Sequence, residues 1–175
     1  MVYWAVQASS GGQVAVKVLS GHLEDATRPR FERETAALGA LLGHPNICTV
    51  FDAGVDASGR PYLVMEYAAR GSLAARLRGE GPLGWADVLV VGVKLAAALE
   101  TAHRAGLLHR DVKPENVLVT VYGEPRLADF GLARFTDDSV SQAGGVTTTV
   151  AHAAPELLRG RPPSVASDVY ALGST

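Results

Sequence analysis

Hydrophobic and polar positions alternate over the first third of the chain in the manner of β-strands. Val14, Val16 and Val18 alternate with Ala15 and Lys17, so the three valines face one side of a strand and Ala15 and Lys17 face the other. Other runs of strand-like residues cover residues 2–6, 47–52 and 62–66. These runs predict a small sheet in the first part of the chain.

Helical patterns lie between and after these strands. Residues 29–42 have Pro29 in the first turn, Gly43 just past the end, and apolar residues at helical spacing between them, as expected for a helix. Residues 73–77 and 85–103 are predicted to form two further helices. The second is apolar nearly all round, which predicts burial inside a larger helical part. The chain is therefore expected to have an α+β fold.

A short hairpin is predicted over residues 117–128. Two apolar-leaning runs, 117–120 and 125–128, flank Tyr122-Gly123, and glycine there permits the positive φ of a tight turn. If Val119 faces Arg126, the same register places Asn116 opposite Asp129. Their oxygens would suit a hard cation such as Mg²⁺. Either residue alone would more often be a helix cap or a solvated carboxylate.

The strongest local signal is the octet His-Arg-Asp-Val-Lys-Pro-Glu-Asn at residues 109–116, followed thirteen residues after Asn116 by Asp129-Phe130-Gly131. Seven chosen residue types in one octet would occur by chance in roughly one case in a billion. This pairing resembles the eukaryotic-type (Hanks-type) protein kinases, and the Lys-Pro-Glu-Asn ending is similar to their Ser/Thr-specific members, including bacterial ones. The resemblance implies a two-lobed protein-kinase-like fold.

The resemblance assigns roles to the residues that match these motifs. Asp111 would be the catalytic carboxylate that accepts the proton of the substrate hydroxyl, and Lys113 would neutralise charge on the transferred phosphoryl group. Asn116 and Asp129 would hold Mg²⁺, for which Mn²⁺ could substitute. The implied reaction transfers the γ-phosphoryl group of ATP to a Ser or Thr of a protein substrate, and autophosphorylation in trans is one form that it can take.

The nucleotide contacts are expected upstream of the octet. Val14-Ala15-Val16-Lys17 resembles the family's Val-Ala-x-Lys, whose lysine holds the α- and β-phosphates, although a strand lysine alone is usually only solvated. Glu34 lies on the apolar stripe of the helix over residues 29–42. A glutamate on such a stripe requires a cation, which makes Glu34 the predicted partner of Lys17.

Residues 68–71 resemble the hinge of the family, and several positions around it gain roles from the resemblance. Backbone groups of Glu66 and Ala68 would bind adenine, and Met65 would gate the space behind it. The side chains expected to enclose adenine are Val2, Ala15 and Leu118. A stack linking the lobes would contain Leu38, Val50, His109 and Phe130.

Residues 129–156 resemble an activation segment that ends in Ala-Pro-Glu. Thr147 or Thr148 is the expected phosphoacceptor, because Arg110 beside Asp111 offers a cation to a phosphate on this segment. Thr149 aligns with the threonine that touches the catalytic loop in Ser/Thr kinases. Farther along, Asp168 would accept backbone hydrogen bonds from the catalytic loop.

The resemblance divides the chain into a partial N-lobe, residues 1–67, and a partial C-lobe, residues 68–175. The expected fold is truncated at both ends, because the family's Gly-rich loop and C-terminal helices are absent from the sequence. Two interpretations follow, namely a fragment of an active Ser/Thr kinase and a non-catalytic remnant that acts as a binding or regulatory module.

Composition changes this picture little. The chain has 47% hydrophobic residues, a net charge of −2 and one cysteine, which favours neither a disulfide framework nor a nucleic-acid-binding surface. No apolar run is long enough to cross a membrane. A cytoplasmic location is expected, although a longer parent protein could carry an anchor outside this segment.

Overall fold

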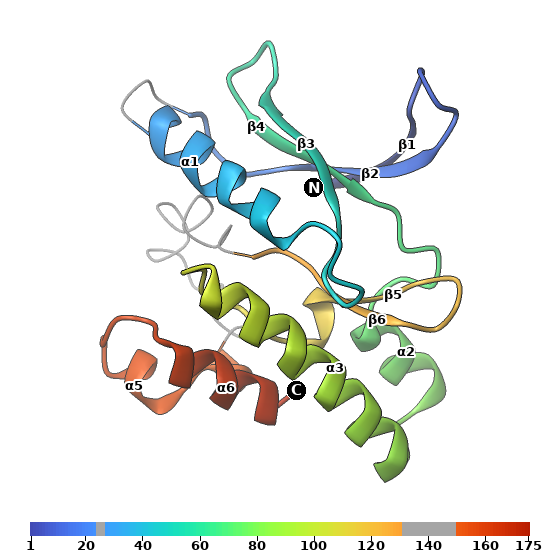
Figure 1. Cartoon of the computed structure of the whole chain (residues 1–175), viewed down its shortest axis with the longest axis vertical. Coiled ribbons are helices and arrows are strands. Elements are labelled where there is room, and N and C mark those ends of the chain that lie inside the picture. Colours follow the sequence, from blue (N-terminus) through green and yellow to red (C-terminus); the bar gives the residue numbers. More distant parts are fainter. Residues whose placement is uncertain (24–26, 131–149) are drawn as a thin grey trace.

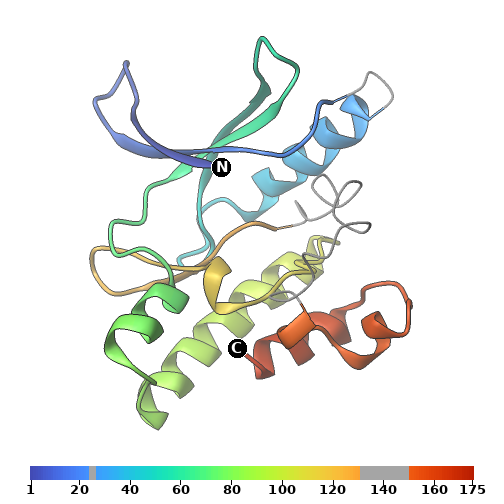
Figure 2. The ribbon, with the colours of Figure 1, turned by 180° about the vertical axis from the view of Figure 1, so that it is seen from behind.

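The computed structural model describes residues 1–23, 27–130 and 150–175. A four-stranded sheet and helix α1 form one half, and the remaining helices form the other (Figure 1). A two-stranded hairpin lies between the halves, and the reverse view shows the same arrangement (Figure 2). This mixture of sheet and helices is the α+β architecture predicted from the pattern.

The sheet contains β1 (Val2–Val6), β2 (Gln13–Val18), β3 (Val50–Val55) and β4 (Pro61–Glu66), in the order β1-β2-β4-β3. All neighbouring strands are antiparallel. The predicted strands are confirmed, except that the third begins at Val50 and carries an irregularity between Val50 and Asp52. Because β2 is an inner strand, Lys17 lies in the middle of the sheet, between Val2 and Leu63.

Helix α1 (Arg28–Leu38) packs Phe31 into the cluster beneath the sheet. The predicted helix extended to residue 42. In the structure it ends at Leu38, and the chain continues as a 3₁₀ turn, η1 (Gly39–Leu41). Such tight turns are common at helix C-termini. Gly43 then adopts a φ of 88°, which a glycine reaches without steric cost and which redirects the chain toward β3.

The helical half contains α2 (Leu73–Glu80), α3 (Trp85–Arg104), α5 (Pro155–Leu158) and α6 (Val165–Gly173), with short 3₁₀ turns η2 (Pro114–Asn116) and η3 (Val150–His152). Helix α3 buries Leu95, Ala98, Leu99 and Ala102. The expectation that α3 is buried all round is wrong. Its first half exposes a set of large apolar side chains, namely Trp85, Val88, Leu89, Val90 and Val93.

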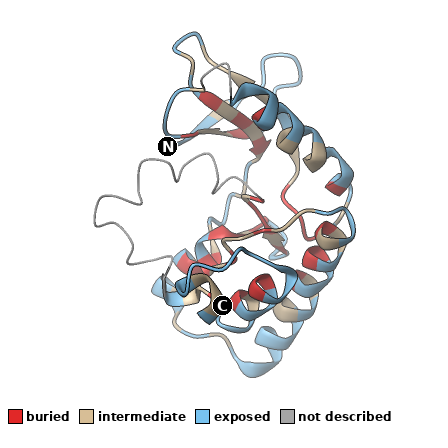
Figure 3. Cartoon of the chain, turned by 90° about the vertical axis from the view of Figure 1, so that its left-hand side faces the viewer, coloured by how far each residue is buried: buried red, intermediate tan, exposed pale blue. Residues whose placement is uncertain are grey.

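Two apolar clusters form the core, and Figure 3 shows buried positions both in the sheet and among the helices. The larger cluster joins α2, α3, α6 and the hairpin, with Leu99, Val117 and Leu127 among its most deeply buried members. The smaller cluster fills the space between the sheet and α1 around Leu63. Among helices in the described part of the chain, none has the length and apolarity that crossing a membrane requires.

The hairpin is formed by β5 (Val117–Val119) and β6 (Pro125–Leu127), and its register differs from the predicted one. Val119 pairs with Pro125 rather than Arg126. The reason is the loop, in which the Thr120 N–H donates to the Glu124 carbonyl and Gly123 has a φ of 83°. A three-residue loop with a left-handed glycine replaces the expected two-residue turn and shifts the register by one. Asn116 therefore lies opposite Ala128, whose N–H donates to the Asn116 carbonyl at 2.8 Å.

Candidate active site

The turn between α3 and β5 gathers three of the predicted site residues around one carboxylate. Lys113 Nζ lies 2.7 Å from Asp111 Oδ2. Asn116 Nδ2 donates to the same oxygen at 2.9 Å and to the Asp111 carbonyl at 2.7 Å. These bonds fix the orientation of the Asp111 side chain. Its carboxylate is half-buried, so it keeps access to a ligand.

His109, fully buried, joins this turn to the segment around Phe130. The His109 Nδ1 accepts the Asp111 N–H at 3.2 Å, and Nε2 lies 2.8 Å from the Ala128 carbonyl. A carbonyl only accepts, so Nε2 carries the proton and the ring is neutral. Burial lowers the pKa of His109 and keeps it neutral. The ring packs against Phe130 with centroids 4.6 Å apart, which confirms this contact of the predicted stack.

The lowered pKa of His109 predicts that acid destabilises the fold. As pH falls below about 6.5, the unfolded chain takes up a proton at this position that the folded chain excludes, so the free energy of unfolding decreases. A His109→Phe variant keeps a ring beside Phe130 but cannot titrate. In urea unfolding at several pH values, the free energy of unfolding should therefore fall more steeply on acidification for the wild type than for the variant. The gap between the two proteins should change with pH. A gap that stays constant down to pH 5 would contradict the prediction.

Asp168 holds the same turn by accepting hydrogen bonds from its backbone, as predicted. Its Oδ2 accepts the His109 N–H and its Oδ1 accepts the Arg110 N–H, both at 2.8 Å. Asp168 lies in the first turn of α6, where Ser164 and Ser167 form a reciprocal capping box. The cap fixes where α6 begins and thereby where Asp168 lies.

The predicted ion pair between Lys17 and Glu34 is not formed. Lys17 Nζ lies 2.5 Å from Asp129 Oδ2, and Glu34 Oε1 accepts from Arg30 Nε at 3.3 Å, one helical turn away. The helical stripe correctly placed Glu34 on the half-buried side of α1, but a stripe does not specify which cation is nearest. Asp129 reaches Lys17 with a backbone φ of 68°, a left-handed conformation that is uncommon for non-glycine residues and that clusters at functional sites.

The predicted adenine-binding residues lie on the adjacent strands β1 and β2, at and just beyond the end of β4, and on the hairpin. Ala15 is buried in the cluster beneath the sheet, and Leu118 packs against that cluster. Val2 pairs with Lys17 on β1 and is exposed. The N–H of Glu66 donates to the Thr49 carbonyl, so it is not available to a ligand. The Ala68 N–H donates no hydrogen bond within the described residues.

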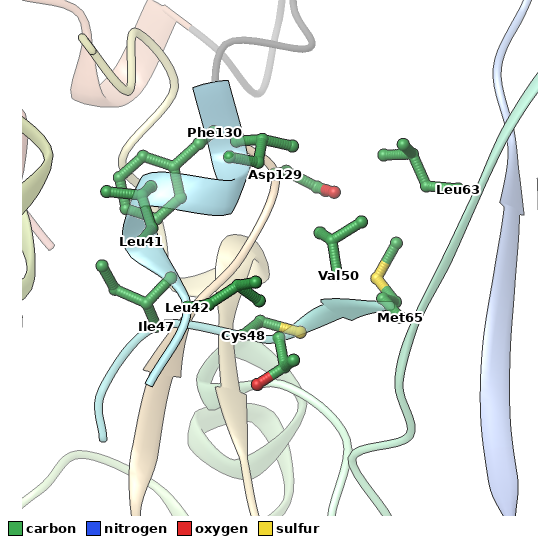
Figure 4. A pocket seen from close by; sticks show the side chains of 11 residues that line it. Leu41, Leu42, Ile47, Cys48, Val50, Leu63, Met65, Asp129 and Phe130 are labelled. Atoms are coloured by element: carbon green, nitrogen blue, oxygen red, sulfur yellow. The ribbon is translucent and has the colours of Figure 1, made fainter. Parts of the chain in front are cut away.

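A small cavity opens behind these residues (Figure 4). Its volume of about 20 Å³ is room for about one water molecule. Met65 lines the cavity, as expected. Three members of the predicted stack, Leu38, Val50 and Phe130, line it as well. Cys48 also lines it, and burial raises the pKa of this thiol to about 12, which makes it a poor nucleophile at neutral pH.

The oxygen atoms of Asn116 and Asp129 are chemically suited to a hard cation. The Asn116 amide uses its nitrogen in bonds to Asp111, and within the described ranges no group donates to its side-chain oxygen. Asp129 follows Ala128, the residue opposite Asn116, and carries the only negative charge that contacts Lys17 among the described residues. Neither here nor elsewhere in those ranges do three or more His, Cys, Asp or Glu form a group that could hold a metal ion. The donor set fits Mg²⁺ bound together with phosphate oxygens.

Two residues in this region escaped prediction. His103 of α3 lies 2.8 Å from Asp168, and Arg126 of β6 is ion-paired with Glu66 at the end of β4. For His103 the sequence held a signal, namely a histidine on the apolar face of a helix. The pairing of Arg126 with Glu66 depends on how two distant segments pack together, and no local sequence pattern indicates it. The predicted phosphoacceptors Thr147 and Thr148, and Thr149 with them, lie outside the described residues.

Comparison with known proteins agrees with this geometry. The sequence pattern of the protein kinase domain matches residues 1–175. The chain belongs to the protein kinase family. The resemblance carried by the octet and by Asp129-Phe130-Gly131 is therefore confirmed, together with the α+β protein-kinase-like fold that it implied.

Several relatives of this kinase chain carry the name serine/threonine-protein kinase. PknK of Mycobacterium tuberculosis (strain H37Rv) is 53% identical over 175 residues, which cover the whole chain and 16% of the relative. PknA of M. tuberculosis (strain H37Ra) is 41% identical over 98% of the chain and 41% of the relative. A probable serine/threonine-protein kinase of Corynebacterium efficiens is 40% identical over 98% of the chain and 27% of the relative. The chain thus spans less than half the length of each.

Proposed function

We propose that this kinase chain transfers the γ-phosphoryl group of ATP to a serine or threonine of a protein substrate. The observation that carries the proposal is the cluster around Asp111, in which one carboxylate contacts both Lys113 and Asn116. A base for the hydroxyl, a cation for the phosphoryl group and an oxygen ligand for the metal are what phosphoryl transfer requires. The names of the relatives, serine/threonine-protein kinases, support the choice of acceptor.

In the proposed reaction, Asp111 orients the acceptor hydroxyl and takes up its proton at Oδ1 or Oδ2. Lys113, already at the same carboxylate, places its ammonium group beside the phosphoryl oxygens and offsets their charge. Asn116 and Asp129 would hold Mg²⁺, which when bound neutralises charge on the β- and γ-phosphates.

The remaining proposed contacts hold the nucleotide in place. Lys17 is the predicted cation for the α- and β-phosphates, and its present contact with Asp129 puts it within reach of the same phosphates. Ala15 and Leu118 offer apolar surface to adenine, and the N–H of Ala68, which donates to no other described residue, offers a donor. Val2 and the Glu66 carbonyl stay predictions for this site.

The test uses ATP labelled either at the γ-phosphate or at the α-phosphate, with Mg²⁺ and a general protein substrate. The proposal predicts that only the γ label moves to protein, and that acid hydrolysis yields phosphoserine or phosphothreonine. ATP binding without any transfer would contradict catalysis by this chain and favour the alternative of a binding or regulatory module. Transfer to tyrosine alone would contradict the proposed acceptor.

A further inference from the structure

A groove lies on the surface between α2 and the hairpin, and the proposed chemistry uses none of its side chains. Strand β5 and α2 pack against each other there (Figures 1 and 2). The volume of the groove is about 520 Å³, and clefts that hold ligands measure about 300–1,000 Å³. The groove is lined by residues of α2, by one residue of β5 and by an arginine that precedes α2, namely Ala75, Arg76, Gly79, Glu80, Val119 and Arg70.

Small residues keep the groove open along α2. Ala75 and Gly79 lie one helical turn apart, on the side of α2 opposite the core residues Leu73 and Leu77. A Cβ atom placed on Gly79 would meet nothing within 4 Å, and Gly79 is not among the glycines with positive φ. Neither packing nor backbone conformation therefore requires glycine here, although glycine weakens a helix relative to alanine. Its effect in this structure is to leave the groove unfilled.

The groove carries a net positive charge, because two arginines face one glutamate. Arg70 is exposed, and among the described residues no acidic side chain pairs with it. The acidic groups nearby have other partners, Glu80 in Arg76 and Glu124 in Lys94. The pair of Arg76 and Glu80 is an exposed contact across one helical turn, of a kind that adds little stability. An anionic ligand therefore meets an available guanidinium at Arg70.

The tip of the hairpin adds apolar surface beside Arg70. A Cβ atom placed on Gly123 would lie 3.6 Å from Arg70 Nη1, so the guanidinium lies close to the loop. In the same loop, Tyr122 is 90% exposed and Val121 is 52% exposed. Arginine and tyrosine are enriched at protein interfaces, where a tyrosine ring gives a large contact area at a low cost in conformational entropy. The pair suits a ligand in which a carboxylate lies next to an apolar group.

We propose that this groove binds an acidic peptide segment of a partner protein. A carboxylate of the segment accepts two parallel N–H bonds from the Arg70 guanidinium, and a neighbouring apolar side chain packs on Tyr122. The hollow along α2 favours a peptide over an anionic membrane, because a flat surface does not reach into a groove. The proposal concerns binding alone and does not rest on phosphate transfer.

Fluorescence anisotropy with two labelled peptides measures the binding. One peptide alternates glutamate with leucine and glycine, and glutamine replaces every glutamate in the other. The acidic peptide should bind at least about tenfold more tightly than its neutral twin. Arg70→Ala should weaken binding of the acidic peptide about fivefold or more, because arginine contacts are frequent hot spots. Arg78→Ala removes the same charge from an exposed position of α2 outside the groove, and should change the affinity less than about twofold.

Gly79→Leu tests the groove without changing its charge. Leucine is a better helix former than glycine, so the midpoint of urea unfolding should not fall, while the affinity for the acidic peptide should fall about fivefold or more as the groove is filled. Unchanged affinity in this variant would overturn the proposal. Equal losses in Arg70→Ala and Arg78→Ala would also overturn it, because they would indicate attraction to overall charge.

Two further outcomes would contradict a peptide site. One is the absence of binding of the acidic peptide to wild type, and the other is binding to phosphatidylglycerol vesicles in place of the peptide. All measurements are made without ATP, so a failure of the proposed kinase function leaves the result on this groove unchanged.

Discussion

Asp111→Asn is expected to lower phosphate transfer by about 10²- to 10⁴-fold, the usual contribution of a general base. The amide has the shape of the carboxylate, and Lys113 and Asn116 remain to hold it, but it cannot take up the proton of the acceptor hydroxyl. ATP affinity should stay within about threefold, because the role assigned to Asp111 is a contact with the acceptor hydroxyl and not with the nucleotide. Initial rates and a nucleotide titration measure the two quantities.

Two matched substitutions serve as comparisons for this result. Glu115→Gln makes the same chemical change in the same turn, at an exposed side chain, and should leave rate and affinity near wild type. Asp129→Asn makes it at the carboxylate that contacts Lys17, and should weaken binding of Mg²⁺ with ATP as well as the rate. Full turnover in the Asp111 variant would contradict its assigned role as the base. Equal effects of all three substitutions would indicate a general effect of lost negative charge.

The sequence indicated which of the predicted site residues lie together within one turn, but it did not give the contacts between residues far apart in the chain. Asp111, Lys113 and Asn116 lie within six positions of one another, so a single turn brings them together and the octet alone was enough to find them. Lys17 and Asp129 are 112 residues apart. Their pairing in place of Lys17 with Glu34 depends on how α1 lies against the sheet, and helical spacing gives the face of a residue without the distance to any other element.

The hairpin register shows the same limit on a smaller scale. The apolar runs and Gly123 were enough to locate both strands, but the loop contains an odd number of residues instead of the even number assumed. Both loops are compatible with a glycine near the end of the turn. The difference moved the partner of Asn116 from Asp129 to Ala128, although both side chains still lie at the same end of the hairpin.

Helix α3 shows why a pattern of apolar residues does not by itself predict burial. Its sequence is apolar on all sides, yet only the second half lies in the core, where α6 and the hairpin pack against it. In the first half, Val91 packs against the edge of that core, and the other large apolar side chains remain exposed. Whether a helix face is buried depends on which other elements pack against it. The sequence of the helix itself does not contain this information.

The contrast within α3 leads to a large expected difference in stability. Leu99 is 2% exposed and Leu89 is 59% exposed on the same helix, so Leu→Ala at both positions makes the same change in opposite surroundings. Leu99→Ala should lower the free energy of unfolding by about 2–5 kcal/mol, because it removes buried methyl groups and leaves a cavity that the core fills only in part. Leu89→Ala should stay within about 0.5 kcal/mol of wild type, since alanine is also a good helix former.

Urea unfolding of both variants, followed by circular dichroism, measures this difference, and an unchanged slope shows that the unfolded state is the same. A domain has only about 5–15 kcal/mol of stability in all, so Leu99→Ala should shift the midpoint clearly. Similar midpoints for the two variants would mean that the exposed half of α3 is covered in solution, by a second copy of the chain for example. A dependence of the Leu89→Ala midpoint on protein concentration would then identify that contact, because association stabilises a fold more at higher concentration.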